Sequence, residues 1–566
     1  MRRFPLCICT IEYMQLYEIL INVKSLLIRN GSEQFKRFVE TPQPLSFKVY
    51  IFNITNPDEV QQGAIPTVSE IGPYVYRQYR RKIIKEFSKD NTTVTYVQQQ
   101  FYIFDKVASL PYSETDNVTV VNMHMNAFLQ AFESEAKDTF QIFFMKINKT
   151  LERTPGVRLI KRVVQGFRGK RKTLLHSPKD PALAILMRHI NANIKDIFNN
   201  PKSMFLTTSV NEYLFEGVKF CINPTGLARA ICNQIKEYGS KTIRTMEDGS
   251  LSFSYFHHKN QTEKALIEVN TGIENIENIM KIKKWNAKSY LNTWLNVVSN
   301  ETMKPSICNM INGTDASLFA PFHKKGDSMY IFSSDICRSV QLFYEQNVMY
   351  SGIPGFRYSI GANFVNDIGP EYSNECFCID KLPNLFKRSN GCLYSGALDL
   401  THCMNAPVIL TLPHMLGAAN EYNTMVHGLK PNMKKHKTFV DVEINTGIPL
   451  RGGKRIQFNM FLKPIKRIKL TENLRISLVP SIWIEEGIAL SPQMVRTLKS
   501  KLINTLDILN TIYLTILVSG VGLTIMSSFL YCTCGNKIII KTDHFPKVVD
   551  APTDLNNVKT KKKHPK

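Results

Sequence analysis

The chain has 566 residues, 43% of them hydrophobic, and its 71 lysines and arginines against 47 acidic residues give a formal charge of +24. This length allows two to four domains or one large domain with a sizeable core. A basic chain can bind nucleic acid, an anionic membrane or an acidic partner. The sequence has none of the aromatic-rich RNA-binding, zinc-finger or basic-zipper patterns, which argues against a nucleic-acid partner.

The N-terminal segment, residues 1–30, has the features of a degenerate membrane anchor. Two arginines precede a mostly apolar stretch, but Glu12, Glu18 and Lys24 interrupt it. Carboxylates at the centre of a span cost about 2.5–3.5 kcal/mol each. A poor signal anchor, a signal peptide and a wrong start of the chain are therefore three open interpretations.

Residues 43–490 are predicted to be rich in β-strands. Helices are predicted at 178–200, from the spacing of apolar residues, and at 491–510, where Ser491 and Pro492 form a favourable start. Strands mixed with helices, without regular alternation, favour an α+β fold. The predicted strands are β-branched or aromatic, partly alternate and are bounded by turn residues: 47–55, 94–104, 249–258, 439–447 and 455–470.

The region near the C-terminus carries the clearest sign of a membrane-spanning helix. Residues 508–536 contain no charged side chain, and lysines follow them. About 20 apolar residues suffice for a membrane-spanning helix, and an excess of lysine and arginine marks its cytoplasmic flank. We predict an extracellular domain at 31–506, a membrane helix at 507–535 and a basic cytoplasmic tail at 536–566. Cys532 and Cys534, next to the cytoplasm, are candidates for palmitoylation; unmodified thiols are an equal alternative.

Eight N-x-[S/T] sequences, the acceptor motif for N-glycosylation, all precede the predicted membrane helix. Asn30 falls in the N-terminal segment, and the other seven fall in the predicted extracellular domain. Their distribution agrees with one large domain outside the cell. The seven candidate acceptors are Asn53, Asn91, Asn117, Asn148, Asn260, Asn300 and Asn312.

The predicted extracellular domain contains eight cysteines whose spacing does not suit zinc. Cys376-x-Cys378 lacks a second ligand pair of ordinary spacing, even if His402 and His414 are included. A C-x-x-C redox motif beside a strand–helix–strand unit is also absent. An extracellular location favours disulfides, but spacing leaves their pairing open. The eight are Cys221, Cys232, Cys308, Cys337, Cys376, Cys378, Cys392 and Cys403.

Catalytic motifs are absent: the sequence has no G-x-S-x-G, H-E-x-x-H, P-loop or G-x-G-x-x-G. Adjacent Glu485 and Glu486 should point to opposite faces of a strand, so we expect one wet and one bonded carboxylate rather than an acid–base pair. His257 and His258 are expected to be solvated. We predict no enzyme activity, no metal and no cofactor.

A set of motifs in one order resembles the class B scavenger receptor family across residues 31–530, and more narrowly the insect sensory neuron membrane proteins, the second type most of all. No single motif is specific, but the set is. The family motifs are TNPDEV, EIGPYVYRQYRRK, SDICRS, ECFC, APVILTLPHML, HGLKPN and TGIPLRGGKRIQFNMFLKPI; the narrower ones are CNMINGTDASLFAPF, YIFSSDICRS, DGSLSFSYFHHKNQT, WIEEGIALS and NGCLYSGALDL.

The resemblance implies a fold and a disulfide pattern. The family fold is a large irregular antiparallel β-barrel with a helical bundle at its apex and a hydrophobic tunnel inside, anchored by membrane-spanning helices. The family pairing implies three bridges here, and it leaves Cys221 and Cys232 as a fourth bridge or free thiols. The three implied bridges are Cys308–Cys376, Cys337–Cys403 and Cys378–Cys392.

The resemblance also implies a function: a non-enzymatic receptor or co-receptor at the plasma membrane that binds lipid-like odorants, such as fatty-acid derivatives or pheromones. It would pass them through the tunnel toward the membrane or an odorant receptor, with odorant-binding proteins as further partners. General uptake of lipids or lipoproteins in non-sensory or support cells is the alternative. Basic residues near the apex, Lys170, Arg171, Lys172 and Arg188, could attract carboxylates; a solvated charge run is the equal alternative.

The chain departs from the family pattern in two places. The first membrane span is degenerate, which puts the geometry of delivery in question. Residues 151–172 are longer and more basic than the family usually carries. Both features bear on where a ligand would enter and leave.

Overall fold

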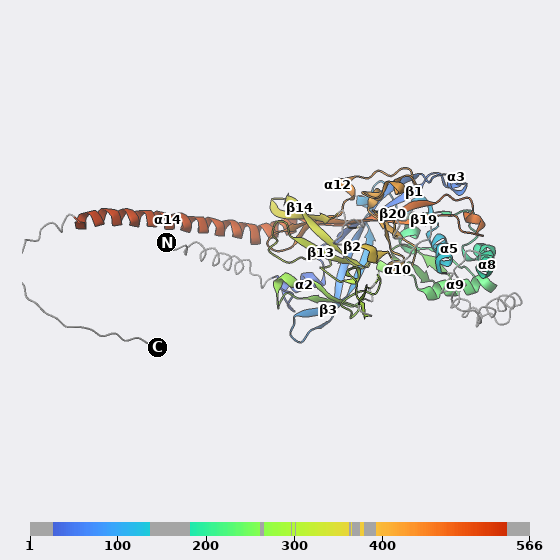
Figure 1. The fold of residues 1–566 in the computed structure, drawn as a ribbon, viewed down its shortest axis with the longest axis horizontal. Helices are drawn as coiled ribbons and strands as arrows, with labels where there is room; N and C mark the ends of the chain where they lie inside the picture. Colours follow the sequence, from blue (N-terminus) through green and yellow to red (C-terminus); the bar gives the residue numbers. More distant parts are fainter. Residues whose placement is uncertain are drawn as a thin grey trace, which may run out of the picture. The chain divides into compact units, whose positions relative to one another are not determined.

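The computed structural model describes residues 26–135, 181–260, 265–295, 297–299, 302–361, 364, 374–378 and 392–539. The chain divides into two compact units between Val495 and Arg496. The first unit is built around one large antiparallel sheet, and the second contains the long helix α14 (Asn504–Ile539) (Figure 1). The predicted N-terminal anchor lies mostly outside the described residues.

The large sheet contains 13 strands among the described residues. Its hydrogen-bonded order is β10-β9-β3-β2-β1-β20-β19-β18-β15-β14-β13, with β17 beside β19 and β16 beside β17. The strands are β1 (Leu45–Ile54), β2 (Val68–Phe87), β3 (Thr93–Phe104), β9 (Ile267–Asn270), β10 (Ile282–Trp285), β13 (Ser328–Ser333), β14 (Arg338–Tyr350), β15 (Ile353–Ile360), β16 (Leu398–Asp399), β17 (Ile409–Thr411), β18 (Phe439–Glu443), β19 (Pro449–Leu462) and β20 (Ser477–Ala489).

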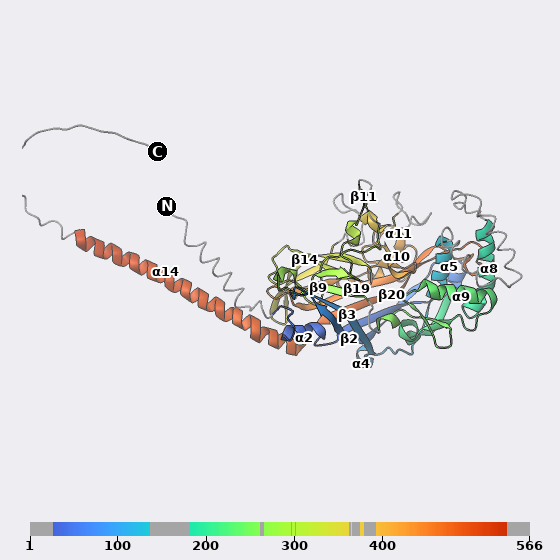
Figure 2. The ribbon, with the colours of Figure 1, turned by 90° about the horizontal axis from the view of Figure 1, so that it is seen from below.

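Smaller sheets and helices cover the large sheet. In both views α5, α8 and α9 gather at one end of it, whereas α2 lies at the other end (Figure 2). The remaining strands are β4 (Asn117–Val121), β5 (Phe205–Ser209), β6 (Val218–Phe220), β7 (Ile243–Thr245), β8 (Leu251–Phe253), β11 (Val297–Ser299) and β12 (Thr302–Lys304). The helices of the first unit are α2 (Glu33–Val39), α3 (Pro57–Gln61), α4 (Lys106–Ser109), α5 (Met123–Glu135), α8 (Pro181–Ile197), α9 (Gly226–Tyr238), α10 (Thr401–Met404), α11 (Asn420–Asn423) and α12 (Met433–His436).

A short segment at Gly313 and Thr314 bridges the two edge strands and nearly closes the sheet into a barrel. The N–H of Ile282 in β10 donates to the Gly313 carbonyl at 2.9 Å, and the N–H of Thr314 donates to Tyr330 of β13 at 3.2 Å. Gly313 has φ +86°, and a Cβ there would lie 1.9 Å from the Tyr330 carbonyl oxygen. Only glycine allows this close approach, so the closure depends on that residue.

Most predicted strands are confirmed, with shifted ends. The segments at 47–55, 94–104, 439–447 and 455–470 correspond to β1, β3, β18 and β19. The prediction at 249–258 is wrong in extent: β8 has three residues, and a 3-10 turn follows at His257–Lys259. The aromatic run there packs its side chains into the core instead of extending the strand.

Both predicted helices are present. The first is α8, and the second begins at Pro492 as α13 (Pro492–Leu498), where the Ser491 hydroxyl accepts the N–H of Met494 at 3.3 Å. It continues through a π-helical turn, Lys499–Ile503, into α14. Among the described residues, Pro492–Thr533 is the one helix long and apolar enough to cross a membrane. The apolar run at 508–536 explains this.

The first unit has two apolar clusters that extend into the barrel. The larger includes Phe47, Tyr76 and Tyr102, and the smaller includes Phe38 and Tyr96. On β2, Tyr76 belongs to the larger cluster while Ile84 packs on the smaller one. The inward positions between them are polar. This layer separates the two clusters and forms the site described next.

Candidate functional site

A cavity of about 300 Å³ lies inside the barrel, lined by side chains from nearly all its strands. Phe38, Met280 and Ile282 form part of its apolar wall. Leu490 and Met494 also line it, and they stand at the end of the first unit, where the apolar helix begins in the chain. The lining of the cavity therefore includes residues that directly adjoin the start of the apolar helix along the chain.

The strand geometry of β2 and β3 places a layer of polar side chains across the barrel. Side chains two residues apart lie on one face of a strand, and the register pairs Gln78 with Tyr102, Arg80 with Gln100 and Lys82 with Gln98. The amide of Gln78 donates to Gln100 at 3.0 Å and to the Tyr102 hydroxyl at 2.8 Å. We call the following seven residues the polar layer: Gln78, Arg80, Lys82, Gln98, Gln100, Lys454 and Glu486.

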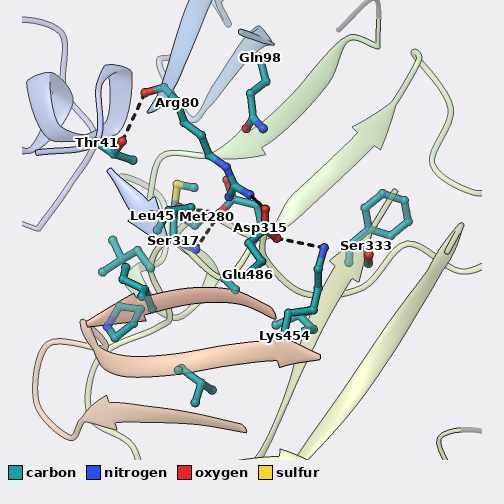
Figure 3. A pocket seen from close by; sticks show the side chains of 18 of the residues that line it. Thr41, Leu45, Arg80, Gln98, Met280, Asp315, Ser317, Ser333, Lys454 and Glu486 are labelled. Atoms are coloured by element: carbon teal, nitrogen blue, oxygen red, sulfur yellow. Dashed lines mark hydrogen bonds and ion pairs between the residues drawn. The ribbon is translucent and has the colours of Figure 1, made fainter. Parts of the chain in front are cut away.

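Ion pairs connect the polar layer to loops on the far side of the cavity. Figure 3 shows Arg80 reaching toward Glu486, which also pairs with Lys454 at 3.0 Å. Lys454 lies 2.7 Å from Asp335, and Asp335 lies 2.6 Å from Lys259. The network thus joins β2, β19 and β20 to the turn after β13.

The carboxylates of this network stay ionised despite their burial. Burial opposes the charge of Asp335, but Lys259 and Lys454 hold its pKa well below the ordinary range. Burial likewise opposes the charge of Glu486, and Arg80 and Lys454 lower its pKa. Buried opposite charges stabilise one another in this way only when they remain close and paired.

Lys82 is the least satisfied cation of the layer. Its side chain is 7% exposed, and the nearest carboxylate oxygen, on Asp315, is 3.4 Å away. Its ammonium lies 4.6 Å from the centre of the Phe38 ring and 5.4 Å from that of Tyr96. Lys82 therefore stands where the polar layer meets the smaller apolar cluster.

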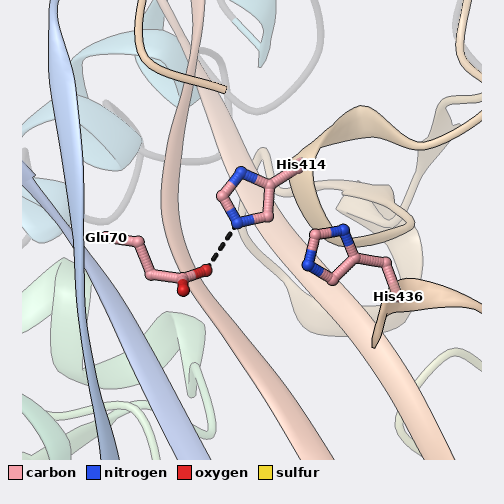
Figure 4. A group of neighbouring side chains, drawn as sticks. All are labelled: Glu70, His414 and His436. Carbon is pink, nitrogen blue, oxygen red and sulfur yellow. Dashed lines mark hydrogen bonds and ion pairs between the residues drawn. The ribbon is translucent and has the colours of Figure 1, made fainter. Parts of the chain in front are cut away.

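A second polar cluster lies on the outer face of the sheet, where Glu70, His414 and His436 bring one potential metal-binding atom each within 4.8 Å of the others (Figure 4). His414 Nε2 is 2.5 Å from the Glu70 carboxylate, to which the indole N–H of Trp483 also donates at 2.7 Å. Burial lowers the pKa of His436 to about 4. The hydrogen bonds of Trp483 and His414 outweigh burial and lower the pKa of Glu70.

The backbone around this outer cluster does not favour a metal. The N–H groups of Lys430 and Asn432 donate to Nδ1 of His414 and His436, each at 3.0 Å. A neutral imidazole whose Nδ1 accepts a hydrogen bond carries its proton on Nε2, which then cannot ligate. A metal-bound histidine instead donates from its other nitrogen. The cluster fits a structural hydrogen-bond network, and His402 does not belong to it.

The cysteines form four disulfides. Three of them are the pairs that the resemblance implies, and the fourth joins the two cysteines that it leaves open. Of the three bridges that involve the cysteines at 376–403, one joins two cysteines of this segment, and the other two join it to Cys308 and Cys337. The bridges are Cys308–Cys376, Cys337–Cys403, Cys378–Cys392 and Cys221–Cys232.

The candidate glycosylation sites differ in exposure. Asn91, Asn117 and Asn260 are exposed, as is Asn30. Asn53 and Asn312 are half-buried, and the Asn53 side chain accepts the N–H of Thr119 at 2.7 Å. The remaining two candidates, Asn148 and Asn300, lie outside the described residues.

Among the described residues, none of the basic or cysteine candidates lines the cavity. Arg188 is exposed on α8 and does not line the cavity, whereas residues 170–172 lie outside the described residues. Cys532 is an exposed free thiol on α14. The side chain of Cys534 lies outside the described set.

Two sequence expectations are corrected. Both Glu485 and Glu486 form ion pairs, so neither carboxylate is left to solvent alone. Glu485 pairs with Lys48 at 2.7 Å and with Arg455 at 2.6 Å on one face of the strand, and Glu486 belongs to the polar layer on the other face. His257 and His258 are partly buried, since the 3-10 turn draws them against the core.

Sequence reasoning missed the polar layer because it predicted no strand at residues 68–87, where β2 lies. The signal was present: from Arg77 to Lys82 both faces of β2 are polar, while its ends carry apolar inward residues. One face of a barrel strand must point inward. A stretch that is polar on both faces therefore had to put polar groups inside the barrel.

Comparison with known proteins agrees with the fold. Residues 4–531 match the CD36 family. The chain is 59% identical to sensory neuron membrane protein 2 of Drosophila melanogaster over 90% of this chain and 91% of the relative. It is 47% identical to the protein of the same name from Aedes aegypti, over 89% and 92% of the two chains. The resemblance seen in the motifs is confirmed, and the chain belongs to the CD36 family.

Proposed function

We propose that this protein is a non-enzymatic membrane receptor or co-receptor that binds lipid-like odorants or pheromones in its extracellular domain. It would pass them toward the membrane or an odorant receptor. Membership of the CD36 family and similarity to sensory neuron membrane proteins support a sensory or lipid-related receptor role.

The cavity in the barrel is the observation that carries this proposal. At about 300 Å³ it reaches the lower end of the range of small-molecule sites, and it combines an apolar wall with a few polar groups. Each methylene moved from water into such a wall gains about 0.8 kcal/mol. A cavity of this kind can hold an aliphatic ligand without covalent chemistry.

The location of the cavity supports transfer toward a membrane. Leu490 and Met494 connect its lining directly to the helix Pro492–Thr533. In this proposal, a ligand leaves the cavity past these two residues. We extend the proposal to the plasma membrane, with the first unit outside the cell and the tail after α14 inside. The tunnel beyond this cavity, the helical apex and the odorant-binding partners are parts of the same proposal.

Ligand binding to the full-length protein in lipid nanodiscs tests the function. We expect saturable binding of dodecanol, an uncharged aliphatic probe, to the wild type. Ser333→Leu should weaken it because Ser333 lines the cavity, whereas Ser328→Leu, on the exposed end of the same strand, should not. Melting temperatures of both variants control for folding.

Absence of saturable binding of every long-chain probe would refute the receptor proposal. Binding that Ser333→Leu leaves unchanged would place the ligand outside this cavity. Antennal localisation, in neurons or in support cells, then separates an olfactory role from general lipid uptake.

A further inference from the structure

Lys82 has unused hydrogen-bonding capacity inside the cavity. A lysine ammonium carries three donors, and the nearest carboxylate among the described residues is the Asp315 oxygen at 3.4 Å. That carboxylate is already shared, since its other oxygen accepts from the backbone and hydroxyl of Ser317 at 3.0 and 2.5 Å. A side chain that is 93% buried seldom leaves such donors without acceptors, because burying an unsatisfied charge is costly.

Other polar atoms near Lys82 are also unsatisfied. Among the described residues, the Nε of Arg80 and the Oε1 of Gln78 are buried without a hydrogen-bond partner. Gln98, directly opposite Lys82 on β3, lines the cavity as well (Figure 3). The unsatisfied donors, the Lys82 ammonium and the Nε of Arg80, therefore belong to neighbouring side chains that both line the cavity, whereas the Gln78 oxygen is an acceptor outside the lining.

The cavity carries excess positive charge. Seven partly or fully buried charged side chains line it, four of them cations and three carboxylates, which leaves a net +1; the exposed Arg37 adds a further cation. An anion bound here would neutralise the excess. The seven are Arg80, Lys82, Lys259, Lys454, Asp315, Asp335 and Glu486.

The apolar wall begins immediately beside the ammonium. The rings of Phe38 and Tyr96 contact Lys82, and Met280 and Ile282 continue the apolar surface within the smaller cluster. A ligand with a negative head and an aliphatic tail would therefore place each part against matching groups. A hydrocarbon without a head group would leave the donors of Lys82 unsatisfied.

We propose that the barrel cavity selects amphiphiles with a single anionic head group, and that Lys82, with Arg80 beside it, receives the carboxylate. This assignment rests on the proposed function and names the ligand class of the same cavity. It differs from a purely hydrophobic tunnel, because the polar layer would discriminate between ligands of equal chain length by their head groups.

Paired probes of equal chain length test the head-group site. The full-length protein in nanodiscs of uncharged lipid is titrated with dodecanoate and, separately, with dodecanol. We expect the wild type to bind dodecanoate about tenfold tighter or more, since hydrogen bonds to charged groups are the strong ones. Lys82→Met should reduce this preference to about threefold or less, while dodecanol still binds.

Three further variants keep the test decisive. Arg81→Met removes the same charge from the neighbouring, exposed position on the opposite face of β2 and should leave the preference intact. Lys82→Arg should retain it. Lys82→Met combined with Asp315→Asn removes both partners of the pair, so it should fold even if the single variant is unstable, and it should still lose the preference.

The outcomes separate this inference from the receptor proposal. Equal binding of dodecanoate and dodecanol by the wild type overturns the anion site but leaves the receptor proposal standing. An undiminished preference in both Lys82→Met and the double variant with Asp315→Asn also overturns it. Failure of the wild type to bind either probe refutes the receptor proposal itself.

Discussion

The polar layer inside the barrel and the Glu70 cluster on its outer face both hold charged groups, but they differ in hydrogen-bond saturation. In the outer cluster both Nδ1 atoms accept backbone N–H groups, and Glu70 accepts from His414 and Trp483. In the inner layer, the Lys82 ammonium and the Nε of Arg80 lack a close acceptor among the described residues. Saturation marks a structural network, whereas unused donors beside a cavity mark a binding site.

The largest loss in the free energy of unfolding should come from removing Lys454, the central cation of the inner network. Lys454→Met leaves Asp335 and Glu486 buried without it, and breaking a buried pair costs about 3–5 kcal/mol. Urea unfolding followed by tryptophan fluorescence measures the loss. Lys219→Met, at a pair whose side chains are about half exposed, should cost under about 1 kcal/mol. Equal losses in the two variants would contradict a continuous inner network.

His124 differs from both polar clusters, because it is a buried histidine surrounded by apolar side chains. Burial lowers the pKa of His124 to about 3, and its Nδ1 has no partner among the described residues. The unfolded chain therefore binds a proton below about pH 6.5 that the folded chain excludes, and stability falls as the pH decreases from 6.5 toward 3. At about pH 5 the loss from this residue should be about 2 kcal/mol.

His124→Phe should remove this acid-dependent loss, because the ring lies among Phe198, Phe220 and Phe253 and phenylalanine does not titrate. Unfolding free energies measured at neutral and acidic pH provide the test. His427→Phe, at an exposed position, should keep the acid dependence of the wild type. A variant at residue 124 with an unchanged pH profile would show that this histidine does not contribute.

In the outer cluster, Glu70→Gln should have a smaller effect. A glutamine oxygen can still accept from both His414 and Trp483, so only the charge is lost, and we expect about 1 kcal/mol. Glu70→Ala should cost more because it leaves both donors unmatched. If the two substitutions cost the same, the hydrogen bonds of Glu70 are not what stabilises the cluster.

Added zinc should have the smallest effect on stability. Since both imidazoles accept backbone N–H groups at Nδ1, ligation at Nε2 would require breaking those bonds. We expect no change in melting temperature on adding zinc to the purified protein. A rise that His436→Phe abolishes would instead assign a metal site to this cluster.

The long apolar helix and several strands could be predicted because they depend on local pattern. The charge-free run at 508–536 exceeds the length that a bilayer requires, and alternation marks β1 and β3. The extent of β8 and the environment of Glu485 could not be predicted, since each depends on which distant segments pack against it. Lys48, which pairs with Glu485, lies 437 residues away in sequence.

The sequence by itself determined the family, the apolar helix and the mixed strand-rich class, because these rest on ordered motifs and on hydropathy along the chain. Only the tertiary structure decided that Gln78, Arg80 and Lys82 point into the barrel. The alternation of side chains along a strand places these three residues on one face of β2. Closure of the barrel through Gly313 decides that this face points to the inside. Whether a strand residue meets water or a cavity depends on how the whole sheet curves and closes.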